Sequence, residues 1–332
     1  MSRRLRYGVL AAVALVGASA TAYRTASAGG RAASAPPSNG DINIEVVTHG
    51  QASDPFWSVF KRGVDDAAAQ MGVSVNYSAP ATFDMVAMSQ LIDAAVAKNP
   101  TGLVVSVPDY DALKDSLAAA HDAGIPIITV NSGSDVYQEI GAITHVGQDE
   151  TIAGEAAGQH LADAGATHVM CINQEVGNAG LDARCAGAKT SIEAAGGTLD
   201  VVQVDLNDAA GAQSTISAAL QSDDTIDAVL ALGPTGASPA LAAIEEVGKT
   251  GDILIGTFDL SEDVIQAIID GNMLFAVDQQ QYLQGYLPVV FLTLYHNNLN
   301  TVGGGQPVLT GPGFVTADNA QQVLDLTGQG SR

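Results

Sequence analysis

The segment Ser53-Asp54-Pro55-Phe56-Trp57 places a carboxylate beside two adjacent aromatic rings. An apolar run at 42–47, which predicts a strand, precedes it, and an amphipathic run at 59–71, which predicts a helix, follows it. An aromatic ring offers a flat apolar surface to the C–H face of a sugar, and a carboxylate accepts hydrogen bonds from its hydroxyls. The turn therefore predicts a site for a small polyhydroxylated ligand. The alternative is that both rings are ordinary core packing.

Other polar side chains follow predicted strands further along the chain. In open α/β sheets, ligands bind beyond the carboxyl ends of the strands, so these positions are candidates for the same site. They carry carboxylates, amides, a hydroxyl and an arginine, which together can donate to and accept from hydroxyl groups. The predicted ligand-binding residues are Asp54, Phe56, Trp57, Asp109, Asn131, Ser132, Asn178, Arg184, Asp259 and Gln279.

Arg184 is notable because arginine is scarce outside the predicted tails. Only Arg62 and Arg184 fall in the predicted folded body, and Arg62 fits the exposed face of the first helix. Arg184 lies early in a predicted helix, behind a Gly-Asn loop. Its five N–H donors could bind ligand hydroxyls or pair with Asp259. A purely structural ion pair is the alternative.

Short apolar runs alternate with longer Ala-rich helical patterns. Strands are predicted at 42–47, 73–77, 103–107, 125–130, 142–146, 167–172, 199–204, 228–232, 253–257 and 274–277. Helices are predicted at 57–71, 84–98, 110–123, 149–164, 180–195, 209–221, 237–248, 261–270 and 281–298. This alternation predicts parallel sheets covered on both faces. Because there are too many units for one compact sheet, the predicted fold class is α/β with two doubly wound parallel-sheet lobes.

Composition and charge narrow the possible functions. A chain of 332 residues with 47% hydrophobic residues can bury the cores of two domains. Its formal charge of −23 repels nucleic acid and anionic lipid, so no nucleic-acid partner is expected. The six histidines show no metal-ligand spacing, and the sequence contains no HExxH, Gly-x-Ser-x-Gly or Walker motif. We therefore expect no metal, no cofactor and no enzyme, although Asp54 and Asp259 would be the nearest approach to a catalytic carboxylate pair.

The N-terminus matches an export signal. Three arginines within residues 3–6 precede an apolar stretch at 8–22, and Ala26-Ser27-Ala28 fits the small-x-small cleavage pattern. We expect cleavage after Ala28, which would take the formal charge from −23 to −27 because four arginines and no acids are removed. A retained N-terminal anchor is the alternative. Residues 29–40 are rich in Gly, Ala, Ser and Pro and predict a disordered lead-in.

Cys171 and Cys185 are the only cysteines. In an exported protein an isolated pair favours one disulfide, here between a strand and the helix that packs back on it. Two separate buried thiols are the alternative.

Five segments in this order carry a family resemblance. They are Asp54 to Trp57, Ala123 to Asn131, Val146 to Asp149, Ile255 to Asp259, and Asp278 to Gly285. Across residues 41–317 the chain resembles the type 1 periplasmic sugar-binding proteins, which are solute receptors of bacterial ABC transporters of the ribose/galactose class. The resemblance implies a monosaccharide or sugar alcohol as ligand, an ABC transporter permease in the membrane as partner, a periplasmic or other extracytoplasmic location, and a monomer.

Carried over by position, the aromatic platform of that family falls on Phe56 and Trp57. Its site arginine falls on Arg184, its site aspartate on Asp259, and its hinge glutamine on Gln279. Two positions depart from the pattern: Asn131-Ser132 replaces an Asp-Arg pair, and Gly233-Pro234-Thr235 replaces an Asn-Asp pair. With fewer charged groups, a linear sugar alcohol or a small deoxy sugar is as well suited as an aldose.

The resemblance also implies three hinge crossings, near Gly147, Gln279 and Thr310. The first lobe would then comprise 41–147 and 280–309, and the second 148–279 and 310–332.

Two further functions remain open. A transcriptional regulator with the same body would need an N-terminal DNA-binding head in place of the export signal, and a receptor for a signalling partner would use the same closing lobes.

Overall fold

The computed structural model describes residues 39–50 and 54–332. The predicted signal peptide, its cleavage site at Ala28 and nearly all of the predicted lead-in lie outside the described residues. Within them, Asn39 donates a hydrogen bond to the backbone oxygen of Met71 at 2.7 Å and accepts one from Asn297 at 2.9 Å. None of the helices in the described ranges is both long and apolar enough to cross a membrane.

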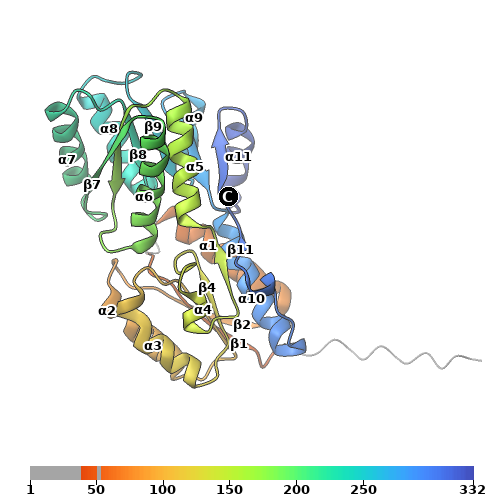
Figure 1. Cartoon of the computed structure of the whole chain (residues 1–332). Coiled ribbons are helices and arrows are strands. Elements are labelled where there is room, and N and C mark those ends of the chain that lie inside the picture. The colour runs from red at the N-terminus through yellow and green to blue at the C-terminus, as the bar shows by residue number, and fades with distance from the viewer. Residues whose placement is uncertain (1–38, 51–53) are drawn as a thin grey trace, which may run out of the picture. The chain divides into compact units, whose positions relative to one another are not determined.

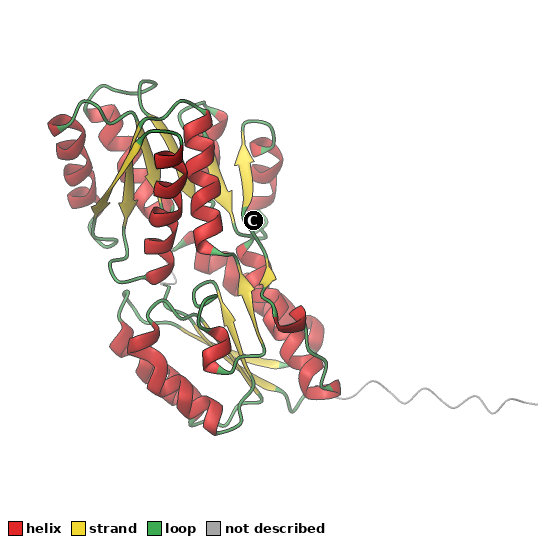
Figure 2. Ribbon diagram, viewed as in Figure 1, coloured by secondary structure: helices red, strands yellow, loops and turns green. Residues whose placement is uncertain are grey.

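The described chain forms two six-stranded sheets, each flanked by helices (Figures 1 and 2). The first sheet has the order β11-β5-β4-β3-β1-β2 and is parallel throughout. Its strands are β1 (Asn43–Val47), β2 (Ser74–Ser78), β3 (Gly102–Val105), β4 (Ile127–Val130), β5 (Thr144–Gly147) and β11 (Val308–Leu309).

The second sheet has the order β12-β10-β9-β8-β6-β7. Its strands are β6 (His168–Asn173), β7 (Thr198–Gln203), β8 (Ala228–Ala231), β9 (Leu254–Phe258), β10 (Phe275–Asp278) and β12 (Gly313–Thr316). The predicted α/β class with two doubly wound lobes is confirmed. The sequence did not predict β12, which runs antiparallel to β10 at the edge of the sheet.

Helices cover both faces of each sheet. On the first, α1 (Pro55–Met71) and α10 (Gln281–Asn298) pack on one face, and α2 (Met85–Val96) and α3 (Tyr110–Asp122) on the other. On the second, α5 (Glu150–Asp163) and α6 (Ala179–Ala194) cover one face, and α7 (Ala209–Ser222), α8 (Pro234–Glu246), α9 (Glu262–Ile269) and α11 (Ala320–Thr327) the other. The short helix α4 (Tyr137–Ile140) precedes β5. Every residue of β3, β4, β8 and β10 is buried, which explains why those runs are apolar without alternation.

Short polar caps set where the helices begin. Asp54 accepts a hydrogen bond from the backbone N–H of Phe56 at 2.8 Å, and Pro55 occupies the first helical position of α1. At the other end, Gly72 adopts a left-handed conformation with φ of 68° and ends the helix. The strand-to-helix turn that carries the two aromatics is therefore encoded by local sequence.

The chain passes between the sheets three times: after β5, after β10 and after β11. Hydrogen bonds join these segments. The backbone N–H of Thr310 donates to the oxygen of Gly147 at 2.7 Å, and the Thr310 hydroxyl donates to the oxygen of Gln279 at 2.7 Å. The three crossings thus lie side by side.

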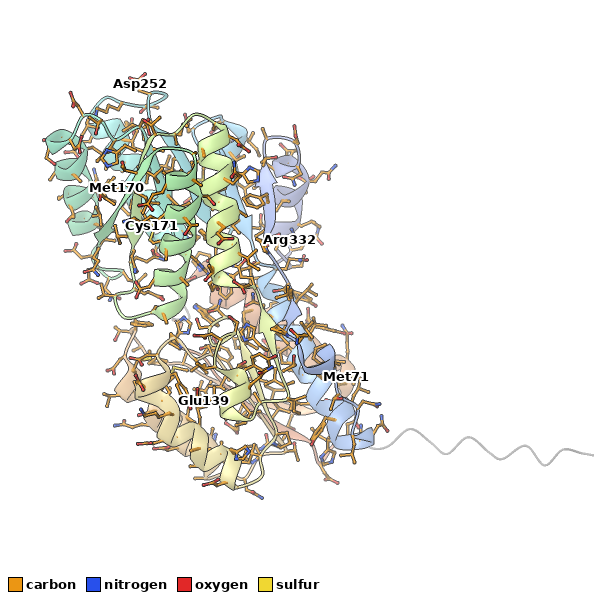
Figure 3. The ribbon with its side chains drawn as sticks, viewed as in Figure 1. Met71, Glu139, Met170, Cys171, Asp252 and Arg332 are labelled. Atoms are coloured by element: carbon orange, nitrogen blue, oxygen red, sulfur yellow. A yellow bond between two sulfur atoms is a disulfide. The ribbon has the colours of Figure 1, made fainter. Side chains whose placement is uncertain are left out.

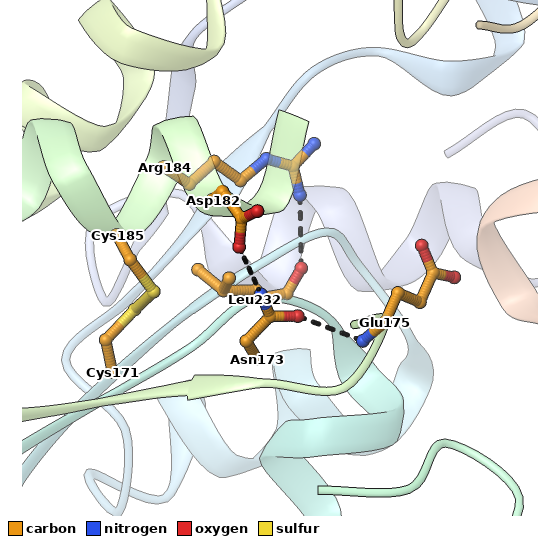
Figure 4. Close-up of a disulfide and its surroundings, with 7 residues drawn as sticks. All are labelled: Cys171, Asn173, Glu175, Asp182, Arg184, Cys185 and Leu232. Atoms are coloured by element: carbon orange, nitrogen blue, oxygen red, sulfur yellow. Dashed lines mark hydrogen bonds between the residues drawn. A yellow bond between two sulfur atoms is a disulfide. The ribbon is translucent and has the colours of Figure 1, made fainter. Parts of the chain in front are cut away.

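The predicted disulfide between Cys171 in β6 and Cys185 in α6 is confirmed, with 6.0 Å between the Cα atoms (Figure 4). Both cysteines are buried in the core beneath α5 and α6.

Candidate functional site

A small cavity lies among the loops that follow the strands of both sheets. Its volume of about 30 Å³ leaves room for about two water molecules. It sits beside the points where the strand order reverses, at β1 and β3 in one sheet and at β6 and β8 in the other. Ligands of open α/β sheets bind at such points. The lining residues are His49, Asp54, Phe56, Trp57, Asn131, Gln174, Glu175, Leu181, Arg184, Leu232, Gly233, Pro234, Thr235, Asp259 and Gln279.

Most of the predicted site residues come together here, from both lobes: Asp54, Phe56, Trp57, Asn131, Arg184, Asp259 and Gln279. The other three lie outside the lining and have local roles. Asp109 caps α3 through the N–H of Ala112, and Asn178 caps α6 through the N–H of Gly180. Ser132 donates to the side-chain oxygen of Asn131 at 3.0 Å.

Sequence reasoning missed four polar lining residues: His49, Gln174, Glu175 and Thr235. The signal was present, because His49 comes two residues after β1 and Gln174 comes directly after β6. The prediction instead chose Asp54 after β1 and Asn178 after β6. Asn178 does not reach the cavity, because its side chain caps the start of α6. Residues next to the strand ends therefore face the cavity, as do Asp54, Phe56 and Trp57 further along the chain after β1.

Trp57 belongs both to the cavity wall and to the core of the first lobe. It is 4% exposed, and its ring packs edge-on against His49 at 4.8 Å and Phe56 at 4.8 Å. The backbone of Gly50 approaches so closely that a Cβ there would lie 1.6 Å from the indole nitrogen. The position therefore requires glycine, and the indole is held in one place.

Arg184 forms a buried ion pair with Glu150. Its Nε lies 2.6 Å from one carboxylate oxygen and its Nη2 lies 3.0 Å from the other, which is the bidentate geometry of strong pairs. Nη1 donates to the backbone oxygen of Leu232 at 3.1 Å (Figure 4). The same nitrogen lies 3.8 Å from Asp259. Burial alone would lower the pKa of Arg184, but the Glu150 carboxylate raises it above its usual value. The structural ion pair left open by the sequence is present, and Arg184 also lines the cavity.

Close packing of α5 on α6 allows this pair to form. A Cβ at Gly154 would lie 2.2 Å from the backbone oxygen of Arg184, and one at Gly187 would lie 2.3 Å from that of Thr151. Only glycine permits such an approach of two helix backbones. Glu150 opens α5, so the short distance between the helices brings its carboxylate to the guanidinium.

A chain of hydrogen bonds links the lobes through Gln279. Asn131 donates to its side-chain oxygen at 3.3 Å, and Gln279 donates to Asp259 at 2.6 Å. Asn131 and Asp259 follow β4 and β9 and have φ values of 60° and 64°. Asn and Asp tolerate this left-handed region better than most residues, and such backbone turns concentrate at functional sites.

His49 is held as a neutral side chain. The Ser106 hydroxyl lies 2.9 Å from the backbone nitrogen of His49 and 2.8 Å from Nδ1. The hydroxyl oxygen accepts from the backbone N–H and also forms a hydrogen bond with Nδ1 of the ring. Burial and, to a smaller extent, the charge of Arg184 lower the pKa of His49 to about 3. Nε2 lies 3.8 Å from Glu175 of the other lobe.

The three remaining lining carboxylates titrate at unusually high pH. Burial raises the pKa of Glu175 to about 7, which the hydrogen bond from Asn178 and the charge of Arg184 only partly offset. Burial likewise raises the pKa of Asp259 to about 7 against the charge of Arg184. Burial also raises the pKa of Asp54, against hydrogen bonds from the N–H groups of Phe56 and Trp57.

The arrangement offers aromatic surface, amides, carboxylates and one arginine around the cavity, from both lobes. These groups suit hydroxyl recognition. Across residues 39–50 and 54–332, no group of His, Cys, Asp and Glu side chains has the geometry to hold a metal ion.

Comparison with known proteins agrees with this architecture. The xylose/arabinose-binding protein XylF of Sulfolobus acidocaldarius is 28% identical over 318 residues, covering 87% of this chain and 77% of that protein. The D-allose-binding periplasmic protein of Escherichia coli is 26% identical over 236 residues, covering 68% of this chain and 76% of that protein. A carbohydrate transporter from Acidothermus cellulolyticus, solved in complex with myo-inositol, is 36% identical with a TM-score of 0.83, covering 88% of this chain and 99% of that one.

The periplasmic binding protein domain matches residues 44–297, which run from β1 to the end of α10 and include every lining residue of the cavity. That span contains both sheets except β11 and β12. The chain therefore belongs to the periplasmic binding protein family.

Proposed function

We propose that this chain is the extracytoplasmic solute-binding protein of an ABC transporter, which captures a monosaccharide or sugar alcohol between its lobes and delivers it to the membrane permease. The observation that carries the proposal is the cavity at the reversal points of both sheets, lined by strand-end polar residues and by Trp57. The relatives support the ligand class, since their names give xylose, arabinose and allose, and one was solved with myo-inositol.

The ligand is bound and released unchanged. His49, the only imidazole in the lining, is neutral, and its Nδ1 faces the Ser106 hydroxyl. Arg184 is committed to Glu150, and Asp259 accepts from Gln279. These contacts support a role in binding hydroxyls over a role in proton transfer. Recovery of the intact ligand by mass spectrometry after prolonged incubation is the expected result, and a converted compound would contradict it.

Binding requires the lobes to separate and close again. A space of about 30 Å³ is too small for a sugar ring, so the ligand enters when Asp54 and Asn131 move away from Arg184 and Asp259. The joined crossings near Gly147, Gln279 and Thr310 are the proposed hinge. The lobes would be 41–147 with 280–309, and 148–279 with 310–332. Contacts to both lobes stabilise only the closed form, so binding shifts the population toward it.

A thermal-shift screen against neutral pentoses, hexoses, alditols and myo-inositol tests the proposal. A specific ligand raises the melting temperature by mass action, because it binds the folded state alone. Asp259→Ala should abolish the shift, whereas Asp252→Ala, an exposed change in the same lobe, should retain it. If no compound of these classes, and no amine-bearing polyol of the kind considered below, stabilises the wild-type protein, the proposal fails.

The remaining expectations follow from the same assignment. The mature protein should begin at Gly29 after export, behave as a monomer and bind no nucleic acid. Sequencing the N-terminus of the exported protein and measuring its mass by light scattering check the first two. Fluorescence anisotropy with labelled duplex DNA checks the third.

A further inference from the structure

The cavity holds more negative than positive charge. Arg184 is the only Lys or Arg among its lining residues, and its charge is already offset by Glu150 through contacts of 2.6 and 3.0 Å. Asp54, Glu175 and Asp259 remain. Among residues 39–50 and 54–332, the only Lys or Arg nitrogen within 4 Å of any of them is the Nη1 of Arg184, 3.8 Å from Asp259, which is beyond hydrogen-bond distance. His49 adds no charge, because it is neutral.

The cavity also offers more acceptors than donors. Glu175 accepts one hydrogen bond, from Asn178, and Asp259 accepts one, from Gln279, so both carboxylates keep acceptor capacity, whereas Asp54 accepts from the N–H groups of Phe56 and Trp57. The side-chain oxygen of Gln174 is buried and has no hydrogen-bond partner among the described residues. Buried acceptors of this kind are normally satisfied, and an unsatisfied one costs free energy.

The two imbalances point to the same kind of ligand. A hydroxyl brings one donor together with acceptor lone pairs, so it relieves an excess of acceptors only in part. A protonated primary amine brings three donors, no acceptor and one positive charge. We propose, on the basis of the function proposed above, that the physiological ligand is a polyol carrying a protonated amine, such as an amino sugar or an aminocyclitol, whose ammonium group lies among Asp54, Glu175 and Asp259.

Without such a cation, protons must supply the missing positive charge. The groups that face Glu175 are Asn178, Asp54, Arg184 and His49, and those that face Asp259 are Arg184, Gln279, Asp54 and Glu150. Burial outweighs the one arginine in both sets, so the pKa of each carboxyl rises to about 7. Lowering the pH below 7 therefore neutralises the same carboxylates that would hold the ammonium. The preference for an amine should be greatest near pH 8 and should decline toward pH 5.

Calorimetry with matched ligand pairs tests the inference. We would compare scyllo-inosamine with scyllo-inositol, and D-glucosamine with D-glucose, and use N-acetyl-D-glucosamine as an analogue whose nitrogen carries no charge. At pH 8, scyllo-inosamine should bind at least about tenfold more tightly than scyllo-inositol, because a charge-assisted hydrogen bond is stronger than a neutral one. At pH 5 this ratio should fall by about tenfold as the carboxylates gain protons.

Two variants assign the preference to named carboxylates. Glu175→Gln and Asp259→Asn keep the size of the side chain and remove its charge, so each should reduce the amine-to-hydroxyl ratio by about tenfold. Asp54 is not used, because its side chain also caps α1. The control is Asp252→Asn, which removes one exposed carboxylate at the end of the second lobe remote from the first lobe (Figure 3).

The outcomes separate this inference from the proposed function. If the neutral member of each pair binds as tightly as the amine at pH 8, or if both variants keep the full amine preference, the inference is overturned while the proposed function stands. If no member of either pair binds and no other polyol does, the proposed function itself fails. Amine preference at pH 8 that declines toward pH 5 and is lost in the variants supports the inference.

Discussion

Trp57 has two roles at the scale of a single residue, because the same ring packs in the first lobe and faces the cavity. Its fluorescence should therefore shift when ligand binds, and the signal is specific because Trp57 is the only tryptophan. Replacement by alanine would also remove core packing, at a cost of about 3–5 kcal/mol in stability.

Trp57→Phe is the informative variant, since it keeps most of the buried apolar surface. It should weaken ligand binding by roughly 1 kcal/mol while the melting temperature changes little, because the larger ring face is lost from the cavity wall. Calorimetry and thermal unfolding measure the two effects. Unchanged affinity together with a large loss of stability would mean that the residue serves packing alone.

Glu175 makes a prediction about pH at the same scale. Its carboxyl has a pKa near 7 in the folded protein against 4.5 for an ordinary glutamate, so the folded state holds an extra proton between these values. Stability should therefore fall as pH rises from about 4.5 to 7, and above pH 7 the full cost of a buried charge is present.

Glu175→Gln removes this titration. The unfolding free energy of the variant minus that of wild type should increase by on the order of 3 kcal/mol between pH 5 and pH 8, because only wild type loses stability over this range through Glu175. Urea unfolding of the ligand-free proteins at both pH values measures the difference, with Asp252→Asn as the control for general surface charge. An identical pH dependence in Glu175→Gln and wild type would contradict the assignment.

At the scale of elements, α6 connects the disulfide to the site. Cys185 of α6 forms the disulfide with Cys171 of β6, and the adjacent Arg184 lines the cavity. Asp182, also in α6, accepts a hydrogen bond from the side chain of Asn173 at the end of β6, at 2.9 Å (Figure 4). The disulfide closes a loop with a sequence separation of 14, which is worth about 3 kcal/mol in the chain-entropy model.

The double variant Cys171→Ala, Cys185→Ala should lose roughly this amount of unfolding free energy and should also bind ligand more weakly. Reductant should destabilise wild type but leave the double variant unchanged, which is the internal control. Denatured wild-type protein should show no free thiols before reduction and two after it. Two free thiols before reduction would contradict the disulfide.

At the scale of the whole molecule, the described residues make individual contacts between the lobes around the cavity. They include Asn131 to Gln279 at 3.3 Å, His49 to Glu175 at 3.8 Å, and the backbone of Ala179 to that of Pro108 at 3.0 Å. We expect open and closed forms to be in balance, and a ligand that contacts both lobes to shift that balance toward the closed form.

Small-angle scattering should therefore show a smaller radius of gyration at saturating ligand than without it. Asp259→Ala should remain at the larger radius under the same conditions, because it loses a contact that only the closed form provides. The same radius with and without ligand in the wild-type protein would argue against movement about the three crossings.

Local sequence was sufficient to predict most of the fold. Strands buried on both faces, such as β3 and β4, were predicted from continuous apolar runs, and α1 was predicted from an amphipathic pattern. The elements missed were β11, β12, α4, α11 and a 3-10 helix at Gly303–Gly305, each eight residues or fewer. Segments this short carry too few residues for a period to show, and β11 and β12 form only because a distant strand offers an edge.

The sequence by itself determined the α/β class, the family and the positions where polar side chains follow strands, because these depend on patterns along the chain. It favoured the disulfide, and the structure decided it by placing Cys171 and Cys185 side by side. Only the tertiary structure decided which of those side chains share a cavity. Glu150 is distant in sequence from Arg184 and becomes its partner because glycines bring α5 and α6 together. The excess of carboxylates around one committed arginine likewise exists only once both lobes enclose the same space, since burial and proximity set the charge balance of a site.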